Sequence, residues 1–343
     1  RRPPRSTLFP YTTPSDLRRL SAILPGFVLV VALAISIYDL GGLGSMARNG
    51  VFDLYQRLLP RQAGPNGPHT VYIDIGPESA QRYGSWPWPW LRVTRLVEAA
   101  RDAGAKAILL DVPLAEADRT SAAELVKLWS PMPPEAGLDV TTLAALPDRD
   151  RALAELLDAT PSILSFVPGK ATYGERRPPK GAPTVMPQNG DARHYALAYP
   201  LWRPSLAMFE ARAKGNGATL PDRTPGTAVR SLPMLMNLDG ALYPSNVMET
   251  LRIARGGSGY RAIVSEPENG FAFGMEPGID SIVIDGADLT APTSTDGSLR
   301  LYFGGPQTRT TIPAWKLMER SADIPSLEGK IAIIGISANG TER

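Results

Sequence analysis

The sequence predicts an α/β fold in which a mixed, largely parallel sheet is flanked by helices and preceded by one transmembrane helix. Three observations support this prediction: an uncharged N-terminal run, a strand–helix–strand pattern between residues 69 and 112, and a second block of strands and helices after residue 228. The chain has 343 residues, 43% of them apolar, which is enough for one large α/β domain or two small ones behind the helix.

The N-terminal run extends from Leu20 to Tyr38 and carries no charge. About 19 such residues can cross the hydrocarbon core of a bilayer as one helix. Arg18 and Arg19 precede the run, and arginine is enriched on the cytoplasmic side of membrane helices. We therefore expect residues 1–19 to form a cytoplasmic tail and the chain from residue 41 onward to lie outside.

A cleaved secretory signal is the alternative interpretation of this run. A basic flank, an apolar core and the small residues Ala32-Leu33-Ala34 also fit that description. The uncharged length exceeds a usual signal core, so we predict an anchor over residues 20–40. No second apolar run is long enough to span a bilayer, and we expect the chain to cross once.

A parallel unit is predicted after the anchor. Apolar residues recur at helical spacing over residues 51–59, which indicates a short amphipathic helix. His69–Gly76 is short, β-branched and bounded by turn residues, as expected of a buried strand. A helix is predicted over residues 89–104, because proline suits its first turn and glycine its end. Ala105–Val112 is a second apolar strand, so the three elements form a right-handed parallel unit.

The remaining regular elements follow the same patterns. Strands are expected at 162–167, 228–237, 279–284, 299–303 and 330–337, and helices at 122–129, 148–157, 245–254 and 313–320. Lys330–Ser337 is too apolar for an edge strand, so we place it inside the sheet. Within an outer domain of residues 41–343, two proline-rich stretches, 113–147 and 168–226, are predicted as loop excursions. The second is either a cluster of surface loops or a small subdomain.

Composition excludes several kinds of site. The chain has no cysteine, so disulfides, zinc–thiolate centres and cysteine nucleophiles are excluded. Its two histidines, His69 and His194, lie far apart in the sequence, which argues against a multi-histidine metal site and a Ser-His-Asp triad. The 36 basic and 34 acidic residues nearly cancel, so no general attraction to nucleic acid is expected. We predict no metal, no cofactor and no nucleic-acid partner.

Polar and aromatic residues gather after the first two predicted strands. Asp74 ends the first strand and Asp111 the second, and we expect them side by side at the carboxyl edge of the sheet, where ligands of open α/β sheets bind. The predicted ligand-binding residues are Asp74, Glu78, Trp86, Trp88, Arg92, Asp111, Glu116 and Asp118, with Trp90 beside them. Such a pocket would combine an aromatic wall, an anchoring guanidinium and several hydrogen-bond acceptors.

These residues also have structural interpretations. Asp74 and Asp111 can cap helices or pair with arginines, and the tryptophans can seal a strand–helix junction between prolines. A calcium or magnesium site is a further alternative, although the D-x-D-x-D-G pattern of a dedicated calcium loop is absent. An enzyme that uses Asp74 and Asp111 would need the two carboxylates at a defined separation with split pKa values. We expect no catalytic residue.

Several separated motifs resemble a known family. VYIDIG at 71–76, ESAQRYGSWPWPW at 78–90 and AGAKAILLDVPLAEAD at 103–118 are similar to the opening signature of the second class of CHASE domain, a sensory extracellular domain associated with cyclases and histidine kinases. Later pieces follow in the family's order: LPMLMNLDGALYPSNVMETLRIARG at 232–256, TDGSLRLYFGGP at 295–306 and LEGKIAIIGISANG at 327–340. This chain departs from the family by having Trp90 where a basic residue commonly follows the WPWP element.

The resemblance implies a receptor in a bacterial inner membrane, with its main domain in the periplasm and no catalysis by these residues. It implies that a small-molecule or protein ligand regulates a cytoplasmic nucleotide cyclase, with adenylate cyclase preferred, or a kinase. It also implies a homodimer held in the lipid bilayer through the anchor and the helix near residues 46–59. The alternative is a membrane-tethered periplasmic interaction or scaffold subunit, because loops rich in tryptophan and proline suit protein contacts.

Overall fold

A computed structural model shows two compact units, Arg1–Arg61 and Gln62–Arg343. The residues that it describes are 24–31, 42–62, 64, 69–112, 114–129, 142, 146–169, 177–179, 185–220, 228–265, 276–305 and 310–337. Within the predicted anchor, residues 24–31 are helical, and the rest of 20–40 lies outside the described residues. Among the helices of the described ranges, none is both long enough and apolar enough to cross a membrane.

Helix α2 (Leu43–Leu58) belongs to the smaller unit. It starts at Gly42, whose φ of 75° lies in the left-handed region, and it ends where the Leu59 N–H donates to the Tyr55 carbonyl at 2.8 Å. The helix predicted over residues 51–59 is confirmed, and it begins earlier than the apolar spacing indicated. Apolar side chains along it, among them Met46 and Val51, are exposed within this unit.

The larger unit is built on a seven-stranded sheet with the strand order β15-β1-β16-β2-β3-β6, in which β7 also pairs with β3. Its strands are β1 (Thr70–Ile75), β2 (Ala107–Asp111), β3 (Ser162–Gly169), β6 (Leu201–Arg203), β7 (Gly215–Ala218), β15 (Thr310–Pro313) and β16 (Ile331–Ile336). All paired neighbours are parallel except β3 and β6. The prediction of a mixed, largely parallel sheet is confirmed, and so is the interior position of β16.

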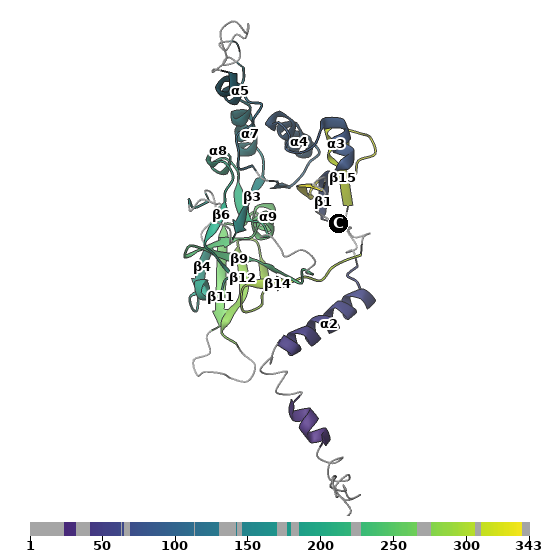
Figure 1. The fold of residues 1–343 in the computed structure, drawn as a ribbon, viewed down its shortest axis with the longest axis vertical. Helices are drawn as coiled ribbons and strands as arrows, with labels where there is room; N and C mark the ends of the chain where they lie inside the picture. Colours follow the sequence, from purple (N-terminus) through teal and green to yellow (C-terminus); the bar gives the residue numbers. More distant parts are fainter. Residues whose placement is uncertain are drawn as a thin grey trace, which may run out of the picture. The chain divides into compact units, whose positions relative to one another are not determined.

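Helices cover both faces of this sheet. One face carries α3 (Pro77–Tyr83), α4 (Trp90–Asp102), α7 (Arg149–Asp158), α8 (Ala207–Glu210) and α10 (Ala314–Met318). Val97 of α4 and Leu157 of α7 pack there with Leu110 of β2, and all three are fully buried. The other face packs Leu109 and Ile163 against α9 (Asn246–Arg255). Figure 1 shows α3, α4 and α7 grouped near β1 and β3, with α5 (Ala122–Trp129) beyond α7.

A second lobe of strands packs around its own core. A four-stranded sheet, β13-β12-β11-β4, consists of β4 (Val185–Gln188), β11 (Gly259–Ser265), β12 (Gly278–Asp285) and β13 (Leu289–Pro292). Smaller sheets are formed by β5 (Ala198–Tyr199), β9 (Leu235–Leu238) and β10 (Ala241–Pro244), and by β8 (Ser231–Pro233) with β14 (Ser298–Arg300). The described part of the predicted excursion 168–226 therefore contains β4, β5, β6, β7, α8 and a short 3-10 helix, η3 (Ala192–His194).

A buried ion pair joins the two lobes through α9. The Arg252 guanidinium donates to both oxygens of Glu249, at 2.8 and 2.6 Å. The Tyr260 hydroxyl on β11 donates to Glu249 Oε2 at 2.8 Å. Glu249 is 0% exposed, and Gly215 on β7 lies so close that a Cβ there would be 2.4 Å from its Oε1. Because each of its oxygens has a donor, this buried carboxylate is compatible with the core.

Candidate functional site

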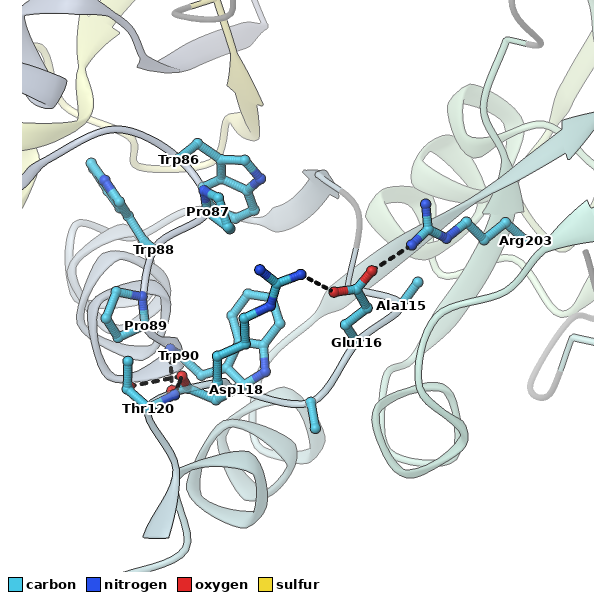
Figure 2. A pocket seen from close by; sticks show the side chains of 12 residues that line it. Trp86, Pro87, Trp88, Pro89, Trp90, Ala115, Glu116, Asp118, Thr120 and Arg203 are labelled. Carbon is cyan, nitrogen blue, oxygen red and sulfur yellow. Dashed lines mark hydrogen bonds and ion pairs between the residues drawn. The ribbon is translucent and has the colours of Figure 1, made fainter. Parts of the chain in front are cut away.

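A pocket of about 290 Å³ lies among several of the predicted site residues. It is formed by the segment between α3 and α4, by the loop that follows β2, and by Arg203 at the end of β6. Its lining residues are Trp86, Pro87, Trp88, Pro89, Trp90, Ala115, Glu116, Ala117, Asp118, Arg119, Thr120 and Arg203. We call it the Trp–Pro pocket. The loop that follows β2 places it at the carboxyl end of the parallel strands, where this fold class binds ligands. Figure 2 shows the pocket from close by.

Three tryptophans that alternate with two prolines form one wall. Trp88 is buried, and its indole N–H donates to the Gly84 carbonyl at 2.7 Å. The ring of Trp86 lies 6.5 Å from that of Trp88 and 6.3 Å from that of Trp90, measured between centroids. The prolines have fixed φ angles, which limits the conformations that this segment can adopt. The wall is therefore an ordered apolar surface.

Asp118 orders the opposite loop and caps helix α4. One of its oxygens accepts the Trp90 backbone N–H at 2.7 Å, which satisfies a donor of the first turn of α4. The other oxygen accepts the N–H and the hydroxyl of Thr120, at 2.8 and 2.7 Å. Asp118 also donates its own N–H to Asp150, and burial raises the pKa of that carboxyl. The carboxylate of Asp118 is thus occupied by contacts that hold the pocket together.

Glu116 bridges two arginines at the mouth of the pocket. Its carboxylate accepts from Arg119 at 3.0 Å and from Arg203 at 2.9 Å, and Figure 2 shows the contact with Arg203. The hydrogen bond from Arg119 holds the pKa of Glu116 below its usual value, and Arg203 adds to this effect. The Glu116 side chain is 57% exposed and that of Arg119 is 79% exposed, so solvent reaches both partners.

Trp90, which lines the pocket, carries a buried donor without an acceptor in the described structure. The residue is only 4% exposed, and its ring meets Phe209 edge to face with centroids 6.1 Å apart. Its indole Nε1–H is buried and has no acceptor among the residues that the structure describes. A buried donor without an acceptor is costly in a folded protein, so it marks a place where a ligand acceptor would be stabilised.

Arg92 and Glu78 lie outside this pocket. Arg92, expected as its anchoring guanidinium, donates to the Tyr83 carbonyl and lines a separate hollow of about 230 Å³ with Asp102 and Arg320. Glu78 accepts the indole N–H of Trp315 at 3.1 Å. Arg92 therefore does not line the Trp–Pro pocket. Its position on α4 turns it toward Tyr83, and the guanidiniums at the pocket come instead from Arg119 and Arg203.

The expectation that Asp74 and Asp111 lie side by side is wrong. Strand β16 runs between β1 and β2, and Gly335 is in register with both aspartates. Asp74 accepts from the Ser337 hydroxyl at 2.8 Å. The two aspartates are separated because β16, the last of the described strands in sequence, lies between β1 and β2.

Asp111 is held by residues of a different part of the sheet. Its Oδ1 accepts from the Thr219 hydroxyl at 3.1 Å and from the Asn246 amide at 3.2 Å. Asn246 opens helix α9, so Asp111 ties β2 to the helix on the far face. Within the described ranges, no group of three or more histidine, aspartate or glutamate side chains is arranged to hold a metal ion.

Comparisons with known proteins give one finding. The family model described as the CHASE2 domain matches residues 28–343. No curated protein and no solved structure matches the chain. The matched range contains every residue of the Trp–Pro pocket and both lobes of the larger unit.

Proposed function

This chain belongs to the CHASE2 domain family, and on that premise we propose that it is the extracytoplasmic sensor of a membrane receptor, with the Trp–Pro pocket as its ligand site. CHASE2 domains are sensory extracellular domains found in cyclase and kinase receptors, and they are not catalytic themselves. The observation that carries the pocket assignment is the buried Trp90 indole N–H, which lacks an acceptor in the described structure. Trp90 lines the same pocket as Arg119 and Arg203, whose ion pairs with Glu116 are open to solvent.

In this proposal residues 20–40 anchor the chain in a bacterial inner membrane and the larger unit lies in the periplasm. Ligand binding then favours one of two arrangements of the receptor and shifts the activity of a cytoplasmic nucleotide cyclase, preferably an adenylate cyclase, or of a kinase. A ligand can shift this equilibrium only by the difference in its affinity for the two arrangements. The pocket must therefore differ between the active and inactive receptor.

The topology can be tested with single cysteines, because the chain has none of its own. Ser6→Cys marks the proposed cytoplasmic tail, and Met186→Cys marks an exposed position on β4. In bacterial cells with a permeable outer membrane, a membrane-impermeant maleimide is expected to label Met186→Cys at once and Ser6→Cys only after lysis. Equal labelling of both variants in intact cells would contradict the proposal.

The signalling role can be tested in the receptor with its complete reading frame. Cells carrying Glu116→Gln or Trp86→Ala are expected to differ from wild type in cyclic nucleotide level at equal receptor abundance. Arg261→Met, which removes an exposed ion pair with Asp285 on β11, is the matched control and is expected to match wild type. Unchanged output from both pocket variants would remove the pocket from the mechanism.

We also propose that the receptor is a homodimer in which the exposed apolar residues of α2 contact a second copy. Met46, Val51 and Leu58 are all exposed within their own unit. In membranes, Val51→Cys is expected to form a disulfide-linked dimer of this chain on oxidation. The same exposed residues would suit a membrane-tethered scaffold subunit, the second candidate function. Crosslinking of Val51→Cys to a different protein, with no homodimer, would favour that function instead.

A further inference from the structure

We infer that the Trp–Pro pocket selects an organic carboxylate with a flat apolar body, and that Glu116 is an internal competitor for the guanidiniums that would bind it. The inference rests on the proposed function, because it names the class of ligand for the same pocket.

The pocket has more free donors than free acceptors. The Trp90 indole N–H is buried without an acceptor in the described part of the chain. Arg119 and Arg203 each make one hydrogen bond to Glu116, and a guanidinium carries five N–H groups. On the acceptor side, Asp118 is buried and already receives three hydrogen bonds. A ligand that accepts hydrogen bonds therefore fits better than one that donates them.

The charges at the pocket also favour an anion. The negative charge of Asp118 lies at the N-terminus of α4, where its carboxylate accepts the Trp90 N–H. The positive end of the helix dipole partly offsets this charge. Two guanidiniums then share the single carboxylate of Glu116 at the mouth. A ligand cation would gain contact with the aromatic faces, but both guanidiniums would repel it. A planar carboxylate matches the fork of an arginine side chain.

Glu116 can give way to such a ligand at little cost. Its carboxylate and both arginines are more than half exposed, and exposed ion pairs contribute little to stability. An incoming carboxylate would replace Glu116 on the same guanidiniums, and its apolar body would lie against Trp86 and the prolines. At about 290 Å³ the volume is near the lower end of known ligand pockets, which suits a body of about one ring.

The ligand class can be tested with three probes that share a phenyl ring and differ in charge: benzoate, benzamide and benzyltrimethylammonium. We expect calorimetry on the full chain in detergent to show benzoate binding on the order of tenfold more tightly than benzamide, since a charged acceptor makes stronger hydrogen bonds. We expect no binding of benzyltrimethylammonium. Tighter binding of the cation than of benzoate would overturn the inference.

Two substitutions test the competition itself. Glu116→Gln removes the competing charge and keeps the shape, so the affinity for benzoate is expected to rise roughly three- to tenfold. Arg203→Met is expected to lower it by about tenfold, because one charge-assisted hydrogen bond is lost. Arg261→Met on β11 is the matched control, with unchanged affinity.

The outcome for the ligand class is separable from the outcome for the receptor. Benzoate affinity that is the same in wild type, Glu116→Gln and Arg203→Met would overturn the inference. The proposed sensor role would then still stand or fall on the cyclic nucleotide measurement with the pocket variants, because that readout does not depend on benzoate.

Discussion

Glu249 and Glu116 are both held by arginine side chains, and they differ in what else surrounds them. Glu249 is 0% exposed, its partner Arg252 is 11% exposed, and the Tyr260 hydroxyl completes the contacts. Glu116 is 57% exposed and is shared by two arginines that retain unused donors. Burial makes the partners of Glu249 dependent on it, because an unpaired charge in the interior is costly. The arginines that contact Glu116 do not depend on it in this way, because water can hydrate their guanidiniums.

The difference shows why an ion pair alone does not identify a site. The Glu249 pair is complete and leaves no room, since even a methyl group at Gly215 would collide with it. The Glu116 pair borders a pocket and a buried indole N–H that has no acceptor in the described structure. The first arrangement stabilises the junction of two lobes, and the second can exchange partners.

Removal of the buried carboxylate is expected to have the largest effect. Glu249→Ala strands the Arg252 guanidinium in the interior, so the free energy of unfolding should fall by about 3–5 kcal/mol. Chemical denaturation followed by circular dichroism measures this change. Glu116→Ala is the matched control at the exposed pair and should leave the denaturation midpoint where it is in wild type. Similar losses in both variants would break the comparison.

The next effect concerns the hydroxyl of Tyr260. Tyr260→Phe removes a hydrogen bond to a charged group and should lower the free energy of unfolding by about 1.5–3 kcal/mol at neutral pH. Burial raises the pKa of Tyr260 above its ordinary value of 10.0, and the charge of Glu249 raises it further. The neutral phenol therefore stabilises the fold below about pH 10, and this contribution is lost as the pH rises toward the higher folded-state value.

The pH dependence separates Tyr260 from a simple packing role. Between pH 8 and 11 the melting temperature of wild type should fall above about pH 10, where the unfolded phenol ionises. The fall should be smaller in Tyr260→Phe, which has no phenol to titrate at this position. Identical slopes for the two proteins would show that the hydroxyl does not resist ionisation in the folded state.

Gly215→Ala tests how tightly the buried pair is packed. The added Cβ would lie 2.4 Å from Glu249 Oε1 and 2.7 Å from its Cγ, which requires the carboxylate to move. Overpacking of this kind costs about 1–3 kcal/mol. Gly305→Ala is the control, since no heavy atom of the described residues beyond its chain neighbours lies within 4 Å of the added Cβ there. Equal midpoints of denaturation for the two variants would indicate that the junction can relax.

The smallest of these effects is expected at the pocket loop. Asp118→Ala removes the cap of α4, and loss of such a cap costs about 0.5–2 kcal/mol. Hydrogen exchange should increase at the amides of Trp90 and Thr120, which donate to Asp118 in the wild type. Unchanged exchange at both amides would mean that the loop does not depend on this carboxylate.

The central strands of the main sheet could be predicted from the sequence, and its edge strands were harder to predict. β1, α4, β2 and β16 are long or strongly apolar, so their hydrophobic patterns predicted them. The elements that were missed include α3, β11 and β15, together with the short strands and the helix inside the predicted excursion 168–226. Helix α3 has seven residues, too few to show a helical period, and β15 has four residues at the edge of the sheet.

Part of the candidate site could also be predicted from the sequence. The tryptophans, Glu116 and Asp118 lie in two loops that a parallel strand–helix–strand unit brings together. Arg203 is 87 residues from Glu116 and is the last residue of a strand of three residues, and no sequence pattern joins them. Asp74 and Asp111 were expected together because they end consecutive strands, but strand order depends on a partner that comes last in the chain.

The most direct test of ligand binding in the Trp–Pro pocket uses the indole N–H of Trp90. In the full chain with isotope-labelled tryptophan, Trp90→Phe identifies its resonance among those of the six tryptophans. Adding benzoate is expected to shift the Trp90 indole N–H, which gains an acceptor, and to leave that of Trp315, which already donates to Glu78, unchanged. A Trp90 resonance that stays in place at a benzoate concentration that saturates calorimetric binding would contradict the account.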